Sequence, residues 1–191
     1  KYQINPHFLM NTLNNIHALV DIDSQSAKRA IIELSNMMRH VVYESSAETI
    51  PISADMKFLE NYIELMRVRY SQQIDIRFNY PKNLPSQYAI PPLVLIVFVE
   101  NAFKHGISYK ENSFINITIT ADNNELTCVV ANSRHDHGTQ SHSSHERSGI
   151  GLNNIIKRMD ILFGNRYTLT TDNTDSKVYI VELVIPVTTN K

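Results

Sequence analysis

The chain has 191 residues, 42% of them hydrophobic, which is enough to bury a core and argues against a disordered protein. Its 18 Lys and Arg and 19 Asp and Glu residues give a formal net charge of -1, so no global field attracts nucleic acid, and we expect no direct nucleic-acid binding. The single cysteine, Cys128, excludes an intrachain disulfide and a multi-cysteine zinc site.

The sequence contains no apolar run as long as the roughly 20 residues that a membrane-spanning helix needs. The longest run, residues 93–99, is too short, and no signal-peptide pattern opens the chain. The first residues lie instead inside a motif, QINPH, so we expect further sequence upstream in the parent protein.

The N-terminal part is predicted to form a helical hairpin. From His7 to about Val20, apolar residues recur at three- and four-residue spacing, with Pro6 near the first turn. A polar break at residues 21–24 predicts a turn with Asp23 or Ser24 as N-cap of a second helix. Helices joined by so short a connection pack antiparallel. Both carry apolar residues on more than one face, so we expect a dimeric four-helix bundle.

A third helix is predicted from about Ser53, the candidate N-cap, to Tyr70. Composition then changes to strand-like alternation, which places a boundary between a helical region, residues 1–71, and a second domain, residues 72–191. The elements predicted in that domain are a strand at 74–80, an apolar helix from 93 to 105, strands near 115–119 and 126–131, a polar loop at 133–148, a helix at 152–163, and strands at 167–171 and 178–185. This order indicates an α+β fold with helices on one face of a mixed sheet.

Four polar residues end the otherwise apolar helix of the second domain, namely Glu100, Asn101, Lys104 and His105. Oxygen-bearing side chains can hold Mg²⁺, and Lys with His can meet phosphate oxygens. The alternative is a helix C-terminus decorated by cations that favour the helix dipole, ending at Gly106.

A second candidate is the segment SGIGLNN, residues 148–154, in front of the last predicted helix. Gly149 and Gly151 would let backbone amides approach an anion beside a helix N-terminus. The spacing does not match a P-loop or a dinucleotide fingerprint. An ordinary loop-to-helix turn is the alternative.

Together these segments resemble the N-box and second glycine box of the GHKL ATP-binding fold. Residues 3–14, QINPHFLMNTLN, are similar to the phosphoacceptor segment of LytS-type sensor histidine kinases. Further likeness lies in Leu34-Ser35, Met38-Arg39, residues 62–64 and 67–70, the IPPL of residues 90–93, and residues 149–155 with Arg158-Met159. The resemblance covers nearly the whole chain and implies a GHKL, or Bergerat-type, α/β sandwich behind the helical hairpin.

What the resemblance implies is a protein-histidine kinase of a two-component system. ATP would phosphorylate His7, and the phosphoryl group would pass to an aspartate of a response regulator, which could carry a LytTR-type DNA-binding output domain. The kinase would act as a homodimer in the cytoplasmic portion of an inner-membrane sensor. No acid follows His7 in the sequence, so the general base is unidentified.

The resemblance also assigns roles at the nucleotide. Asn101 would coordinate Mg²⁺, Glu100 would lie beside the metal and its waters, and Lys104 and His105 would face the phosphates. At the position of the aspartate that reads adenine stands Asn132, without the glycines that usually follow, and an amide oxygen can accept from the amino group. The remaining nucleotide-binding positions are those of the second glycine box: Gly149, Gly151, Leu152 and Asn154.

Other interpretations stay open. The loop that contains His135, His137, His142 and His145 could be a metal tract, although we favour a lid over the nucleotide. The chain could be a degenerate kinase that serves as a dimerisation scaffold, or a different GHKL ATPase that hydrolyses ATP to drive clamp closure.

Overall fold

The computed structural model describes residues 6–43, 47–70, 74–108, 110–135 and 144–189. Contacts divide them into two compact units. The helical unit contains the described residues within 1–74 and 84–96, together with residue 189, and the α/β unit contains 75–83 and 97–188. The sequence predicted two separate domains that meet at residue 71. These contact units do not test that boundary, which stays a prediction.

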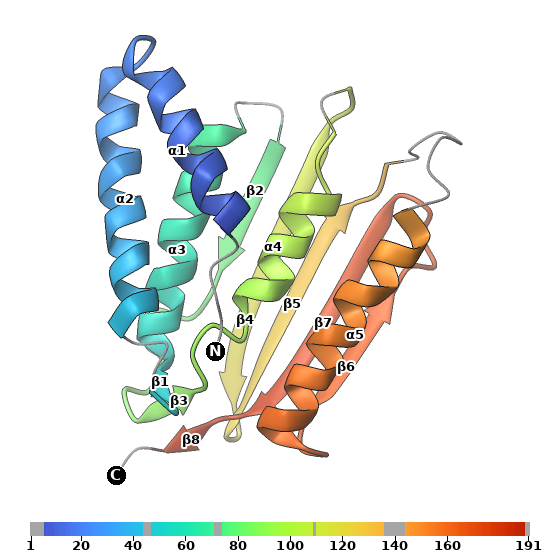
Figure 1. The fold of residues 1–191 in the computed structure, drawn as a ribbon. Coiled ribbons are helices and arrows are strands. Elements are labelled where there is room, and N and C mark those ends of the chain that lie inside the picture. The colour runs from blue at the N-terminus through green and yellow to red at the C-terminus, as the bar shows by residue number, and fades with distance from the viewer. Residues whose placement is uncertain (1–5, 44–46, 71–73, 109, 136–143, 190–191) are drawn as a thin grey trace. The chain divides into compact units, whose positions relative to one another are not determined.

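Three helices make up most of the helical unit: α1 (Pro6–Val20), α2 (Ser24–Tyr43) and α3 (Ile52–Arg69). The hairpin expected from the sequence is present, with α1 and α2 side by side (Figure 1). Asp23 caps α2 as predicted, because its carboxylate accepts from the Ser26 N–H at 3.0 Å and from the Ser26 hydroxyl at 2.6 Å. The buried side chains of this core include Ile16, Ala30, Leu34, Met37, Met56, Leu59, Ile63 and Met66.

Two short strands precede helices and were not predicted. β1 (Ile50–Pro51) pairs antiparallel with β3 (Tyr88–Ile90) through Ile50↔Ile90 and Pro51↔Ala89. Because β1 ends at Pro51, the chain passes directly from this strand into the first turn of α3. The N-cap of α3 is Pro51, and no side chain caps the helix. The prediction of Ser53 as N-cap was therefore wrong.

The α/β unit is built on a five-stranded sheet in the order β2-β4-β5-β7-β6. Its strands are β2 (Ile74–Asn79), β4 (Ser113–Asp122), β5 (Glu125–Ser133), β6 (Thr168–Asp172) and β7 (Val178–Pro186). The pairs β4–β5, β5–β7 and β6–β7 are antiparallel, whereas β2 and β4 run in the same direction in Figure 1, so the sheet is mixed as predicted. A last strand, β8 (Thr188–Thr189), follows β7.

One face of the sheet carries the core of this unit. Alternate residues point to that face, and α4 (Ile96–His105) and α5 (Ser144–Phe163) cover it (Figure 1). Cys128 is buried in this core as a free cysteine. The other buried residues of this core include Ile115, Ile117, Ile119, Leu126, Val130, Val181, Leu183 and Ile185 from the strands, and Phe98, Val99, Phe103, Ile155, Met159 and Phe163 from the helices.

The turn between β4 and β5 consists of Asn123 and Asn124, both with positive φ, 49° and 61°. Two consecutive positive φ values define the type I′ hairpin turn, which matches the right-handed twist of the strands. No helix in the described part of the chain is long and apolar enough to cross a membrane.

Candidate functional site

The last turns of α4 carry the polar cluster that the sequence singled out. Glu100 and Asn101 are half-buried, whereas Lys104 and His105 are exposed. The helix ends as expected at Gly106, whose N–H donates to the Ala102 carbonyl at 2.7 Å. The cluster thus combines two oxygen-bearing side chains against the protein with two basic side chains toward solvent.

Gly106 packs directly against Asn132 at the end of β5. A Cβ on Gly106 would lie 2.6 Å from the Ala102 carbonyl oxygen and 2.7 Å from the Asn132 Cβ, closer than real Cβ atoms come. Only glycine therefore lets the end of α4 reach the end of β5. This contact brings together the two segments that the sequence assigned to metal and adenine.

Asn132 is 4% exposed, and its Nδ2 donates to the Ser133 carbonyl at 2.8 Å. The sheet register places Tyr179 of β7 directly opposite, on the face that the helices cover. Burial raises the pKa of the Tyr179 phenol, which keeps it neutral at physiological pH. The sequence analysis did not single out Tyr179, because its place opposite Asn132 depends on the register of β5 and β7.

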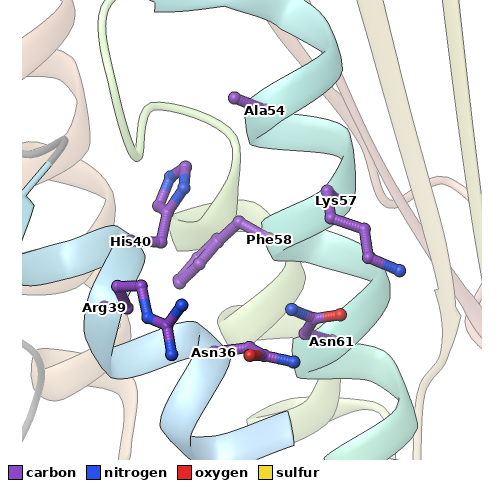
Figure 2. Close-up of a pocket in the computed structure, with 7 residues that line it drawn as sticks. All are labelled: Asn36, Arg39, His40, Ala54, Lys57, Phe58 and Asn61. Carbon is purple, nitrogen blue, oxygen red and sulfur yellow. The ribbon is translucent and has the colours of Figure 1, made fainter.

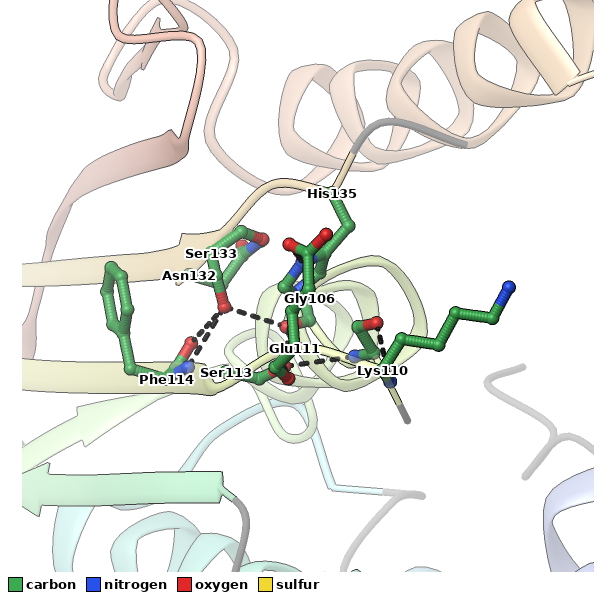
Figure 3. Close-up of polar contacts among 9 residues, drawn as sticks. Gly106, Lys110, Glu111, Ser113, Phe114, Asn132, Ser133 and His135 are labelled. Atoms are coloured by element: carbon green, nitrogen blue, oxygen red, sulfur yellow. Dashed lines mark hydrogen bonds and ion pairs between the residues drawn. The ribbon is translucent and has the colours of Figure 1, made fainter. Parts of the chain in front are cut away.

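Ser133 links the end of β5 to strand β4 and to Gly106 at the end of α4 (Figure 3). Its hydroxyl donates to the Gly106 carbonyl at 2.9 Å and accepts from the Phe114 N–H, also at 2.9 Å. The side chain is buried, so these bonds form away from competing water. Ser133 is a positioning residue for Asn132, and no local sequence signal identified it.

His135 begins the polar loop and is held in place. Its ring nitrogens lie 3.0 Å from the Ser113 hydroxyl and 3.1 Å from a carboxylate oxygen of Glu111 (Figure 3), and its side chain is 6% exposed. His137 and His142 lie outside the described residues, and the side chain of His145 is not described. Among described residues, no group of three or more His, Cys, Asp and Glu could hold a metal ion.

The second glycine segment lies inside a helix. α5 begins at Ser144, so Gly149, Gly151 and Leu152 are helical, and the predicted loop up to residue 148 and helix start at Leu152 were wrong. Each glycine inside the helix lowers its stability by about 1 kcal/mol relative to alanine. The buried residues Ile155, Met159 and Phe163, further along α5, hold the helix against the sheet. Asn154 is exposed on the same helix.

The site segments gather at one end of the α/β unit. In Figure 1 the C-terminal end of α4, the C-terminal end of β5 and the N-terminal end of α5 all lie at the same end of the sheet. His7 lies in the first turn of α1, in the helical unit, and its side chain is outside the described part.

Comparison with known proteins defines the relationship. Residues 1–74 match the family model described as Histidine kinase. Over 96% of its length the chain is 29% identical to Sensor protein LytS of Oceanobacillus iheyensis, and over 96% it is 28% identical to Sensor protein LytS of Bacillus subtilis. Over most of its length, the chain is similar to the LytS sensor histidine kinases. It spans about a third of the length of these curated relatives, 33% and 32%.

Solved structures support the fold of this chain. Full-length ShkA in complex with AMPPNP matches with a TM-score of 0.54 at 17% identity, covering 91% of this chain and 39% of ShkA. The catalytic domain of histidine kinase ThkA matches with a TM-score of 0.50 at 18% identity, covering 74% of this chain and 97% of that domain. The expected α+β fold of GHKL type is confirmed.

Proposed function

We propose that this chain is the catalytic region of a LytS-type kinase that phosphorylates His7 with ATP and passes the phosphoryl group to a response regulator. The observation that carries the proposal is the packing of Gly106 against Asn132, which joins the polar end of α4 to the end of β5. Similarity to LytS sensor kinases along most of the chain supports the same reaction.

Asn132 is proposed to read adenine. Its Nδ2 is already engaged with the Ser133 carbonyl, and no described residue donates to its Oδ1. An amide oxygen accepts a hydrogen bond from the adenine amino group, whereas guanine presents an oxygen there. The site should therefore prefer ATP to GTP, without the charge-assisted strength of a carboxylate.

The α4 cluster fits a magnesium–phosphate role. Mg²⁺ prefers oxygen ligands and usually takes only one or two from the protein, which Asn101 and Glu100 can provide. The ion would neutralise phosphate charge. Lys104 and His105, exposed beyond them, would meet the phosphate oxygens. In the helical form of α5, the backbone N–H groups of Gly149 and Gly151 are used within the helix, so phosphate binding there requires its first turns to open.

The transfer itself needs positioning more than covalent help. A ring nitrogen of neutral His7 attacks the γ-phosphorus while the bond from phosphorus to the bridging oxygen of ADP breaks, and ADP leaves with that electron pair. The phosphohistidine then gives the phosphoryl group to an aspartate carboxylate of the regulator. An imidazole suits this role because its neutral form is well populated near pH 7.

A homodimer is part of the proposal. Met10, Leu13 and Val20 are exposed along one stripe of α1, and Ile31 and Ile32 are exposed on α2. Apolar residues in such a stripe favour burial against a second copy, as in a four-helix bundle. The location in the cytoplasmic part of a membrane sensor likewise rests on the likeness to LytS.

A second candidate is a degenerate kinase that acts as a dimerisation scaffold. Two observations favour it: an amide stands at the adenine-reading position, and α5 continues through the glycine segment. This candidate predicts that the hairpin dimerises and that ATP does not bind.

The deciding experiment incubates the chain with Mg²⁺ and γ-labelled ATP and assays acid-labile, alkali-stable label. We expect label on wild type and on His17→Ala, a control that removes an exposed histidine of the same helix, but not on His7→Ala. Label on His7→Ala would remove His7 from the mechanism. ATP binding without label would mean that upstream input is needed, and no ATP binding would favour the scaffold. Steady hydrolysis without label would favour a GHKL ATPase of another kind.

A further inference from the structure

A hollow of about 350 Å³ lies between α2 and α3 in the helical unit, apart from every residue assigned to nucleotide or phosphotransfer (Figure 2). This volume is near the lower limit, about 300 Å³, of small-molecule sites in proteins. Its lining residues are Asn36, Arg39, His40, Ala54, Lys57, Phe58 and Asn61.

The polar lining of the hollow is basic and rich in amides. Arg39 and Lys57 bring two cations, and none of the lining residues carries a carboxylate. Lys57 already contacts Glu60 at 3.4 Å, with side chains that are 69% and 30% exposed, so the charge of Lys57 is partly offset. The guanidinium of Arg39 is thus the principal charge that a ligand would meet.

Asn61 brings an amide to the wall of the hollow. The residue is 6% exposed, but its amide atoms are not among the fully buried polar atoms that lack a hydrogen-bond partner, so the amide is open to the hollow. A ligand in the hollow can therefore take the place of water at this amide. In Figure 2 the amides of Asn36 and Asn61, from α2 and α3, point toward one another across the hollow.

An aromatic pair supports this arrangement. The rings of His40 and Phe58 stack with centroids 4.7 Å apart and an interplanar angle of 22°. Phe58 is buried, and the stacked rings fix the separation of α2 and α3 beside the polar groups. A rigid wall with low polarity strengthens charge-assisted hydrogen bonds made next to it.

We propose that this hollow binds an oxyanion, with the Arg39 guanidinium pairing its charge and the amides of Asn36 and Asn61 donating to its oxygens. A guanidinium matches two oxygens of one phosphate or carboxylate group, and the amide N–H groups satisfy others. The ligand class is therefore a phosphate or carboxylate group on a small molecule. This site does not depend on the proposed kinase activity.

The test is an NMR titration of the isotope-labelled chain with inorganic phosphate at constant ionic strength, followed at the side-chain amide resonances of Asn36 and Asn61. Residue-resolved detection separates this hollow from any phosphate binding in the α/β unit. We expect saturable shifts that weaken at least about tenfold in Arg39→Gln, since a hydrogen-bonded charge is lost. Arg29→Gln, which removes an exposed arginine of the same helix that bonds Ser26, is the matched control and should titrate like wild type.

A second variant tests the proposal even if Arg39→Gln does not fold correctly. Asn61→Asp is nearly isosteric and places a carboxylate in the hollow, so it should abolish phosphate binding with unchanged circular dichroism. A parallel titration with malonate identifies the source: competition with phosphate indicates a carboxylate ligand class as well, and its absence a phosphate group. No saturable shift of either amide, or equal binding by Arg39→Gln and wild type, overturns the proposal.

Discussion

The carboxylate of Asp55 on α3 accepts a hydrogen bond from the backbone N–H of Leu93 at 3.1 Å, and both residues are 0% exposed. Leu93 has a φ of 58°, in the left-handed region, which costs a non-glycine residue about 1–2 kcal/mol. The buried carboxylate offsets part of that strain and holds the segment that leads into α4.

Asp55→Ala should lower the free energy of unfolding by about 1–3 kcal/mol, because the Leu93 N–H would be left buried without its acceptor. Asp55→Asn keeps an acceptor oxygen and should lose less. Urea unfolding of the three proteins measures the difference. Equal stability of the alanine variant and wild type would show that the bond contributes nothing.

Gly106→Ala should weaken ATP binding as well as stability. The new methyl group would overlap the Ala102 carbonyl and the Asn132 Cβ, and moving Asn132 displaces the proposed adenine acceptor. Gly164→Ala is the matched control, since Gly164 has a φ of 58° but no atom within 4 Å of a Cβ. Calorimetric titration with ATP should show loss of affinity only for the Gly106 variant, while thermal unfolding should show loss of stability for both. Unchanged ATP affinity in Gly106→Ala would separate this contact from nucleotide binding.

Asn132→Ala should reduce the preference for ATP over GTP about fivefold, the effect of one hydrogen bond of about 1 kcal/mol. Thr118→Ala, an exposed change on the neighbouring strand β4, controls for general effects on the sheet. Competition of both nucleotides against a fluorescent ATP analogue gives the ratio. A preserved ratio would assign adenine reading to another group.

Asp23→Asn should remove an acid-sensitive part of the hairpin's stability. The hydrogen bonds from the Ser26 side chain and backbone lower the pKa of Asp23, so its contribution is complete above the ordinary value of about 3.9 and disappears as pH falls through the lower value in the folded chain. Thermal unfolding of wild type and Asp23→Asn should therefore differ by a constant amount from neutral pH to about 4 and converge below it. A difference that grows on acidification would contradict this assignment.

The sequence predicted the parts of the fold that depend on local periodicity. The three N-terminal helices and the alternating strands β4, β5 and β7 follow from apolar spacing, and the Asp23 cap follows from residue type and position. β1 and β3 were missed because two or three residues carry no measurable alternation.

Residues of the candidate site could be predicted only where they belong to a local sequence motif. The α4 cluster stood out as polar residues at the end of an apolar helix, and Asn132 came from the resemblance. Ser133 and His135, in contrast, owe their contacts to partners 19 to 27 residues away in the chain. The early start of α5 was missed because glycines normally argue against helix, and the buried stripe that anchors the helix lies beyond them.

The turn at Asn123 and Asn124 has a consequence for how the α/β unit folds. β4 and β5 pair across two residues, whereas β5 reaches β7 only after α5 and β6 have been spanned. Closing the short loop costs little chain entropy, so the β4–β5 hairpin is expected to form first and to offer β7 a template. Asn124→Gly, which gives the preferred Asn-Gly type I′ sequence, should then accelerate refolding while leaving the unfolding rate nearly unchanged.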